Sequence, residues 1–341
     1  MKPAFLITID TEGDNLWAAP RTITTRNTSY LGRFQNLCER YDLKPTYLTN
    51  WEMAKDPDFV EFARASMARK SCEIGMHLHA WNSPPLIALT ADDFSHQPYL
   101  IEYPPNLIRD KVHHITDVLE EKFETKMRSH RAGRWAFNET YAQILIDRGY
   151  TVDCSVTPCV SWSFAKGDPA GVGGTDYSAF PNRAYYVDPK DIRRSGPSTL
   201  LEVPMTIRPA IEPPLGRMAV RLTSGSRLAR KVVRRIWPSP LWLRPNGRNR
   251  THMLELVERV VASGEDYVEF MLHSSEFMPG GSPTFPSERS IELLYEDLEA
   301  LFECAGKICE GMTLSKYREI HDTRSLSGLN SDAQMKTVSG A

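Results

Sequence analysis

The sequence has few of the features that secreted or membrane proteins use. Its six cysteines include no C-x-x-C pair, and they lie in apolar or helix-like stretches, so we expect reduced, buried thiols rather than disulfides or metal ligands. No stretch approaches the ~18 consecutive apolar residues of a membrane span. The apolar run near the start is too short for a signal peptide and leads into acidic residues. These features favour a cytoplasmic protein.

Overall charge is also low, but its distribution is uneven. The net charge is −2, yet residues 215–250 contain ten lysines and arginines and no acidic residue. Within this window, residues 226–243 combine an apolar helical stripe with basic side chains and tryptophans. One interpretation is an amphipathic helix that contacts the inner membrane face; the other is a helix packed on the domain with a solvated basic face. Aromatic residues do not otherwise interleave with the charges, which argues against nucleic-acid binding.

The order of apolar runs predicts an α/β fold. Helical patterns alternate with short strand-like runs, which is typical of a parallel sheet or barrel built from βα units. We expect one domain over residues 1–321, with an aromatic and glycine-rich insertion at 158–198, a basic insertion at 209–250 and a flexible tail at 322–341. The expected strands are 4–9, 45–50, 72–78, 126–132, 150–156, 199–207 and 267–274.

Polar side chains follow most of these strands. In parallel α/β folds, functional residues gather at the carboxyl ends of the strands. The residues at these ends are Asp10, Glu12 and Asp14, then His77 and His79, then His130, Arg131 and Arg134, then Asp153, and finally His273, Ser274 and Glu276. So many titratable groups after apolar strands indicate a shared site.

The spacing within two of these groups suggests a metal. Side chains two residues apart on an extended strand face the same side, which holds for Asp10 with Glu12 and for His77 with His79. Two imidazoles and one carboxylate, with open positions for water, are typical of hydrolytic metal sites. Glu12 or Asp14 would complete the set. The alternatives are a solvated acidic loop and a structural histidine pair.

Five segments together resemble a known family. ITIDTEGD, EIGMHLHAW, RSHRAGRW, VDCSVTP and FMLHSSE are similar, in this order, to the motifs of the polysaccharide deacetylases of the NodB-homology, carbohydrate esterase type. Divergent members associated with surface-polysaccharide or lipopolysaccharide gene sets are the most similar. The resemblance implies a distorted, incomplete (β/α) barrel of about seven parallel strands and a metal-dependent removal of acetyl groups from an amino sugar.

The resemblance also implies roles for individual residues. Asp10 matches the catalytic base, Arg131 the arginine that orients it, His273 the general acid and His77 the first histidine ligand. Asp153 resembles an acidic residue that supports the arginine or the acid. The usual second aspartate is replaced by Thr11 and the usual second histidine by Trp81, so we expect Glu12 and His79 to be the remaining ligands of a divalent metal, most plausibly Zn²⁺.

The remaining candidates concern the substrate. A backbone N–H near Arg134 or Trp135 would stabilise the oxyanion. Aromatic residues of the first insertion either wall a sugar-binding cleft or pack on one another. The expected substrate-binding residues are Trp81, Arg134, Trp135, Tyr177, Tyr185 and Ser274.

The expected substrate is an acetylated saccharide, lipid-linked or phosphorylated if the basic insertion approaches a membrane. The alternatives are a saccharide-binding barrel with weak or no catalysis, and a metal-dependent hydrolase of another amide or ester.

Overall fold

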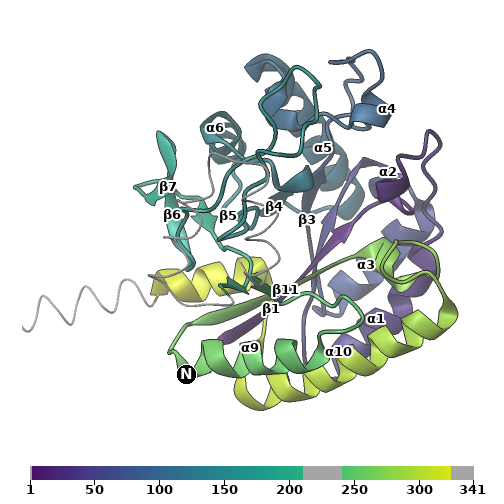
Figure 1. The fold of residues 1–341 in the computed structure, drawn as a ribbon, viewed down its shortest axis with the longest axis vertical. Helices are drawn as coiled ribbons and strands as arrows, with labels where there is room; N and C mark the ends of the chain where they lie inside the picture. Colours follow the sequence, from purple (N-terminus) through teal and green to yellow (C-terminus); the bar gives the residue numbers. More distant parts are fainter. Residues whose placement is uncertain (1, 210–239, 324–341) are drawn as a thin grey trace, which may run out of the picture.

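A curved, mostly parallel sheet forms the centre of the computed structural model, which describes residues 2–209 and 240–323 (Figure 1). Seven parallel strands run in the order β11-β1-β2-β3-β4-β5-β8. They are β11 (Tyr267–His273), β1 (Ala4–Thr11), β2 (Thr46–Thr49), β3 (Glu73–Leu78), β4 (Ser129–Ala132), β5 (Val152–Asp153) and β8 (Leu201–Glu202). The α/β class and the seven parallel strands of the sequence prediction are confirmed.

Short strands extend this sheet at its margins. β6 (Tyr185–Asp188) pairs antiparallel with β8 and with β7 (Asp191–Ser195), and β12 (Glu310–Gly311) pairs with β1. A separate antiparallel pair joins β9 (Ile207–Arg208) to β10 (Leu241–Trp242).

The barrel is incomplete, as expected. Within the described residues, no backbone ladder joins β8 to β11. The gap is bridged by single hydrogen bonds: the Glu269 N–H donates to Thr206 Oγ1 at 2.8 Å, and the Tyr267 hydroxyl donates to the Pro204 carbonyl at 2.8 Å.

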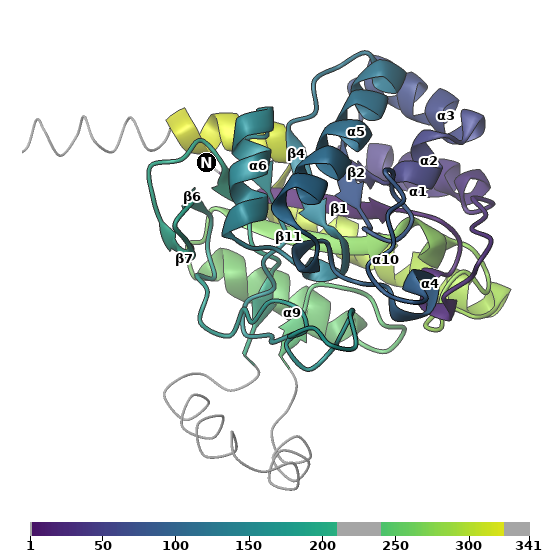
Figure 2. The same ribbon diagram turned by 90° about the horizontal axis from the view of Figure 1, so that it is seen from above.

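Helices surround the sheet (Figures 1 and 2). They are α1 (Thr28–Arg40), α2 (Trp51–Ala54), α3 (Pro57–Ala68), α4 (Asp93–His96), α5 (Pro105–Phe123), α6 (Glu139–Arg148), α9 (Arg250–Ala262) and α10 (Glu288–Ile308), and residues 314–323 are also helical. The Asp56 side chain caps α3 at its N-terminus, with Pro57 in the first helical position, and Gly149 ends α6 with a φ of 91°.

Strand alternation divides the buried side chains into two sets. On β1, Phe5, Ile7 and Ile9 belong to the large core beneath the helices, whereas Ala4 and Leu6 belong to a smaller cluster inside the barrel. The inward positions continue along the same strand through Thr8 and Asp10 to Glu12 just beyond it. This alternation aims the polar residues at the strand ends into the barrel mouth.

The basic segment and the tail, the cysteines and the membrane-spanning character are compared with the sequence expectations in turn. Of residues 226–243 only 240–243 lie within the described residues, and of the predicted tail only 322 and 323 do. Within the described residues no disulfide joins the cysteines, but Cys159 is exposed and Cys304 half-buried, not buried as predicted; Cys159 lies in an irregular loop after β5. None of the described helices has the length and apolar character needed to cross a membrane.

Candidate metal centre and active site

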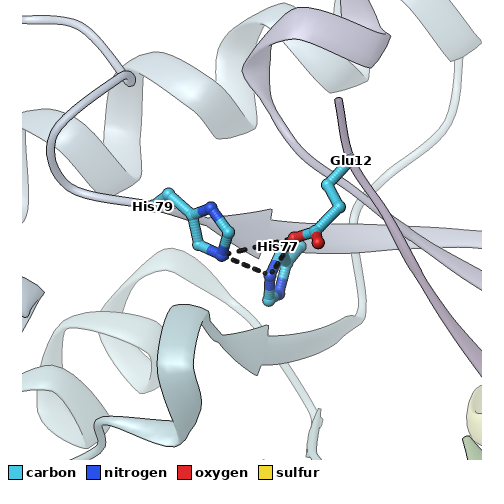
Figure 3. Close-up of side chains that lie close together, drawn as sticks. All are labelled: Glu12, His77 and His79. Atoms are coloured by element: carbon cyan, nitrogen blue, oxygen red, sulfur yellow. Dashed lines mark hydrogen bonds and ion pairs between the residues drawn. The ribbon is translucent and has the colours of Figure 1, made fainter. Parts of the chain in front are cut away.

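Glu12, His77 and His79 converge at the mouth of the barrel (Figure 3). The two Nε2 atoms lie 3.0 Å apart, and Glu12 Oε2 lies 3.5 Å from His77 Nε2 and 3.4 Å from His79 Nε2. All three residues are buried. The predicted association of the HxH pair with the acidic loop after β1 is therefore present.

These three atoms fit a divalent metal. Ligand atoms about 2.0 Å from a tetrahedral Zn²⁺ lie about 3.3 Å from one another, which is close to the three distances in this cluster. The Nδ1 atom of His77 lies 3.0 Å from the carbonyl oxygen of Arg131. Because a carbonyl only accepts, Nδ1 carries the proton and Nε2 keeps its lone pair for a metal.

His79 has the protonation state that a ligand needs. Burial, and next the adjacent His77, hold the pKa of His79 well below its usual value, so the imidazole stays neutral. Its ring stacks on Trp81 at 4.4 Å between centroids. Trp81 thus orients His79 from the position where the related motif has a second histidine.

Asp14 is excluded from this cluster by its own hydrogen bonds. Its carboxylate accepts from the Thr24 hydroxyl, from Arg26, and from the backbone and side-chain amides of Asn27, at 2.8 to 3.1 Å. Asp14 therefore fixes the loop after β1, and Glu12 is the residue that faces the histidines.

Asp10 lies beside the cluster and is held by Arg131. The guanidinium Nη1 donates to Asp10 Oδ1 at 2.7 Å, while Asp10 Oδ2 lies 4.0 Å from His77 Nε2. Burial alone would raise the pKa of Asp10, but Arg131 and then the nearby histidines outweigh it and hold that pKa well below its usual range. Asp10 is therefore ionised at neutral pH, as a base must be.

Glu269 completes the surroundings of Arg131. The Nη2 atom donates to Glu269 Oε1 at 2.6 Å and to Thr8 Oγ1 at 2.7 Å, and Nε donates to the Cys154 carbonyl at 3.1 Å. Arg131 is fully buried. These contacts fix the guanidinium rigidly, and through it the carboxylate of Asp10.

His273 approaches from the opposite side of the site. Its Nε2 atom lies 3.8 Å from Asp10 Oδ2 and 3.9 Å from Glu12 Oε1. Its Nδ1 atom lies 3.0 Å from Glu276 Oε2, which also accepts from Arg244 at 3.0 Å. The carboxylate of Glu276 orients the imidazole so that Nε2 faces the space between the carboxylates.

Asp153 does not have the expected position. We predicted support for Arg131 or His273, but the Asp153 carboxylate bonds His130 Nδ1 at 2.5 Å and the Ser155 hydroxyl at 2.9 Å. The reason is the alternation of side-chain directions along the strand. Its neighbours Val152 and Cys154 face the barrel interior, so Asp153 faces the helices, where His130 also bonds Tyr141. Glu269 supports Arg131 in its place.

A single cavity of about 350 Å³ contains the proposed catalytic and metal-binding side chains other than the buried Arg131 and Asp153. Of the six expected substrate-binding residues, Trp81, Arg134 and Trp135 line it. Its lining comprises Asp10, Glu12, Leu16, Trp17, His77, His79, Trp81, Gln97, Tyr99, Arg134, Trp135, Trp162, Ala165, Arg244 and His273.

The other three expected substrate-binding residues do not line the cavity, and their hydroxyl groups form hydrogen bonds within the protein. Tyr177 is buried and its hydroxyl donates to the Trp135 carbonyl, and the Tyr185 hydroxyl donates to the Ile192 carbonyl. Ser274 is buried and exchanges hydrogen bonds with the backbone of Glu12, at 3.0 Å to the N–H and 3.1 Å to the carbonyl. Its hydroxyl therefore positions the candidate ligand Glu12 and does not line the cavity.

Several residues in and around the cavity escaped the sequence reasoning. Trp17 and Tyr99 reach it from two loops that have no periodic pattern, whereas Trp162 belongs to the aromatic insertion that was expected to wall a sugar-binding cleft. Glu269 was detectable, because a lone carboxylate inside the apolar strand YVEFML needs a buried partner.

Glu52 is the other residue that was missed. It lies at the start of α2, is half-buried and accepts from three donors: Gly13 N–H at 3.0 Å in the loop that carries Glu12, Asn82 Nδ2 at 2.9 Å in the loop after His79, and the adjacent Asn50 Nδ2 at 2.6 Å. Glu52 therefore connects the two segments that carry the candidate metal ligands.

No protein-family model matches this sequence, and no curated protein matches it significantly. Solved structures do match. A candidate polysaccharide deacetylase from Mycobacterium smegmatis has a TM-score of 0.51 at 14% identity, covering 95% of this chain and 92% of that chain. A candidate glycoside hydrolase/deacetylase from Parabacteroides distasonis has a TM-score of 0.59 at 9% identity, covering 94% and 72%.

A glycoside hydrolase of type GH57, a branching enzyme from Pyrococcus horikoshii, is also similar, with a TM-score of 0.51 at 10% identity and coverage of 94% and 70%. The architecture is thus shared with carbohydrate-active proteins of more than one activity, and the activity of this chain has to be argued from its site. The chain thus has the same overall fold as the candidate polysaccharide deacetylase and the candidate glycoside hydrolase/deacetylase.

Proposed function

We propose that this protein is a metal-dependent deacetylase that removes an acetyl group from the nitrogen, or from a hydroxyl oxygen, of a sugar. The observation that supports this most strongly is the joint placement of three units in one cavity. These are the Glu12–His77–His79 cluster, Asp10 and His273. Arg131 and Glu276 hold Asp10 and His273 from behind the cavity wall. The motif resemblance suggests surface-polysaccharide or lipopolysaccharide assembly as its setting.

Glu12, His77 and His79 would hold the metal, and their nitrogen and oxygen donors suit Zn²⁺. When bound, such an ion lowers the pKa of coordinated water and polarises an acyl carbonyl. Asp10 takes the proton of the attacking water, because Arg131 keeps its carboxylate ionised and aimed at the cluster.

His273 has the position of the general acid. Its Nε2 atom faces Asp10 and Glu12 from the far side of the cavity, and Glu276 holds its Nδ1. It delivers a proton to the departing amine or alkoxide as the bond to the acyl carbon breaks. A backbone N–H at Arg134 or Trp135 remains our proposal for the donor to the oxyanion.

The test is acetate release from a panel of N-acetyl and O-acetyl sugars, with Asp10→Asn as the inactive variant. We expect activity that a chelator abolishes and Zn²⁺ restores. Acetate release that persists without metal would contradict the mechanism. Stoichiometric metal with sugar binding but no acetate release would favour the saccharide-binding barrel instead, and release from simple esters or amides alone would favour a hydrolase of another class.

A further inference from the structure

Arg134 differs from the other arginines of the site in having no acidic partner. Its guanidinium carbon lies 4.0 Å from the centroid of the Tyr99 ring, and Nη1 donates to the Gln97 carbonyl. In the chain from residue 2 to 209 and from 240 to 323, Arg134 forms no ion pair with an aspartate or glutamate. Glu102 acts on this charge only from beyond ion-pair distance, so the guanidinium that lines the cavity is not neutralised by a carboxylate in contact with it.

The two other arginines at the site are compensated. Arg131 is paired with Asp10 and Glu269, and Arg244 is paired with Glu276. Since these two charges are already balanced by carboxylates at hydrogen-bond distance, neither has much capacity left for a charged substrate group. Arg134 is the one arginine of the three that keeps this capacity.

Placing Arg134 in this position costs free energy in two ways. Arg134 and Trp135 have left-handed backbones, with φ of 55° and 61°, and Gln97 opposite has a φ of 50°. Non-glycine residues in this region are strained, and such strain concentrates at functional sites. Partial burial also opposes the charge and lowers the pKa of Arg134, which Tyr99 and the more distant Glu102 offset only in part. A group that binds Arg134 would offset both costs.

We infer that the substrate, on the assumption that the proposed deacetylase function holds, is an acetylated sugar that carries an anionic oxygen group, a carboxylate or a phosphate ester, bound by Arg134. The planar guanidinium presents paired N–H donors that match both groups. Stacking on Tyr99 leaves the edge of the guanidinium available for this contact. The cavity of about 350 Å³ has room for one sugar ring with its substituents and is lined by Trp17, Trp81 and Trp162, whose indoles supply apolar surface for the ring.

Binding of deacetylated products tests this inference without turnover. Glucosamine, glucosamine 1-phosphate, glucosamine 6-phosphate and glucosaminuronic acid are titrated into the metal-loaded protein by calorimetry. At least one anionic sugar is expected to bind about tenfold or more tightly than glucosamine, the effect of one charge-assisted hydrogen-bonded pair. Comparison of the phosphates with the uronic acid shows which anion the site accepts.

Three variants assign the preference to Arg134. Arg134→Gln should reduce the difference between anionic and neutral sugars to less than about threefold, whereas Arg134→Lys should keep part of it. Arg64→Gln is the control, because it also removes one positive charge but from an exposed pair with Glu124 on the outside of α3. It should leave the preference unchanged.

Acetate release from the corresponding N-acetyl sugars separates this inference from the proposed function. Equal or better binding and deacetylation of neutral sugars would overturn the anionic substrate and leave the deacetylase intact. An Arg134-dependent preference in binding, with no acetate released from any sugar, would retain the anion site and refute the deacetylase. A preference that survives in Arg134→Gln would assign the anion to another residue and overturn the inference.

Discussion

The Nε2 atoms of His77 and His79 lie 3.0 Å apart at the end of β3, with Glu12 Oε2 within 3.5 Å of both. Replacement of either histidine by alanine removes one of three proposed ligands. We expect the affinity for Zn²⁺ to fall by more than about 100-fold, since even the loss of groups that support a ligand costs 10- to 100-fold. Metal content after dialysis measures this.

The control for these variants is His113→Ala, on an exposed position of α5. It should retain the metal of the parent protein. Full retention in both His77→Ala and His79→Ala would refute the proposed ligand set.

Glu52 should matter for metal binding although it is not a ligand. Burial raises its pKa to about 7, and three donors point at its two oxygens. Glu52→Gln places an amide donor against one of those donors, so we expect the free energy of unfolding to fall by about 1–3 kcal/mol and Zn²⁺ affinity to fall about tenfold or more. Chemical denaturation and competition with a metal indicator measure the two effects. The exposed Glu61→Gln on α3 is the control, and a Glu52→Gln variant with parental metal affinity would show that the two loops are held independently.

Gly133 should be intolerant of a side chain. A Cβ atom at this position would lie 2.3 Å from the Leu78 carbonyl oxygen and 2.3 Å from His79 Cδ2. Gly133→Ala must therefore displace the end of β3 or the His79 ring, and we expect weakened metal binding and acetate release. Gly32→Ala in α1, where a Cβ meets no atom within 4 Å, should be neutral or stabilising by about 1 kcal/mol. Equal behaviour of the two variants would contradict the close approach.

Glu276 should affect turnover more than metal binding. Burial alone would raise its pKa, but Arg244 and His273 lower it to about 2, so the carboxylate is ionised and holds His273 Nδ1. Glu276→Gln should lower kcat about 100-fold, within the range of general acid catalysis, and leave the bound metal unchanged. Steady-state kinetics beside metal analysis separates the two, with the exposed Glu296→Gln as control. Parental kcat would exclude His273 as an acid that depends on Glu276.

Glu269 should make stability depend on pH. Burial raises its pKa to about 7 despite the opposing effect of Arg131, compared with 4.5 for an ordinary glutamate. The folded protein then binds this proton more tightly than the unfolded chain, so the stabilisation is complete below pH 4.5 and is lost as the pH rises through 7.

The variant Glu269→Gln does not titrate at this position. Its stability relative to the parent should increase by about 3 kcal/mol between these two pH values. Urea denaturation across the range measures the difference. A constant difference between the two proteins would show that Glu269 ionises normally.

The sequence determined the elements and the faces of the strands. Period-two spacing placed His77 with His79 and Asp10 with Glu12, and local signals set the limits of α3 at Asp56 and of α6 at Gly149. These features depend on backbone geometry over a few residues, and short-range patterns report such geometry directly.

Only the tertiary structure showed which of several equivalent candidate side chains in the sequence lie in the site. Asp14 and Glu12 belong to one acidic run, but the Asp14 carboxylate accepts hydrogen bonds from Asn27 and Arg26, whereas the Glu12 carboxylate faces the histidines. The direction of the Asp153 side chain was predicted wrongly. Because β5 is only two residues long, its pairing with β4 and β8 decides which of its side chains face the barrel interior. The partners that orient the site, such as Glu269, more than 130 residues from Arg131, come from distant strands. Their pairing follows from closure of the barrel, which no local pattern encodes.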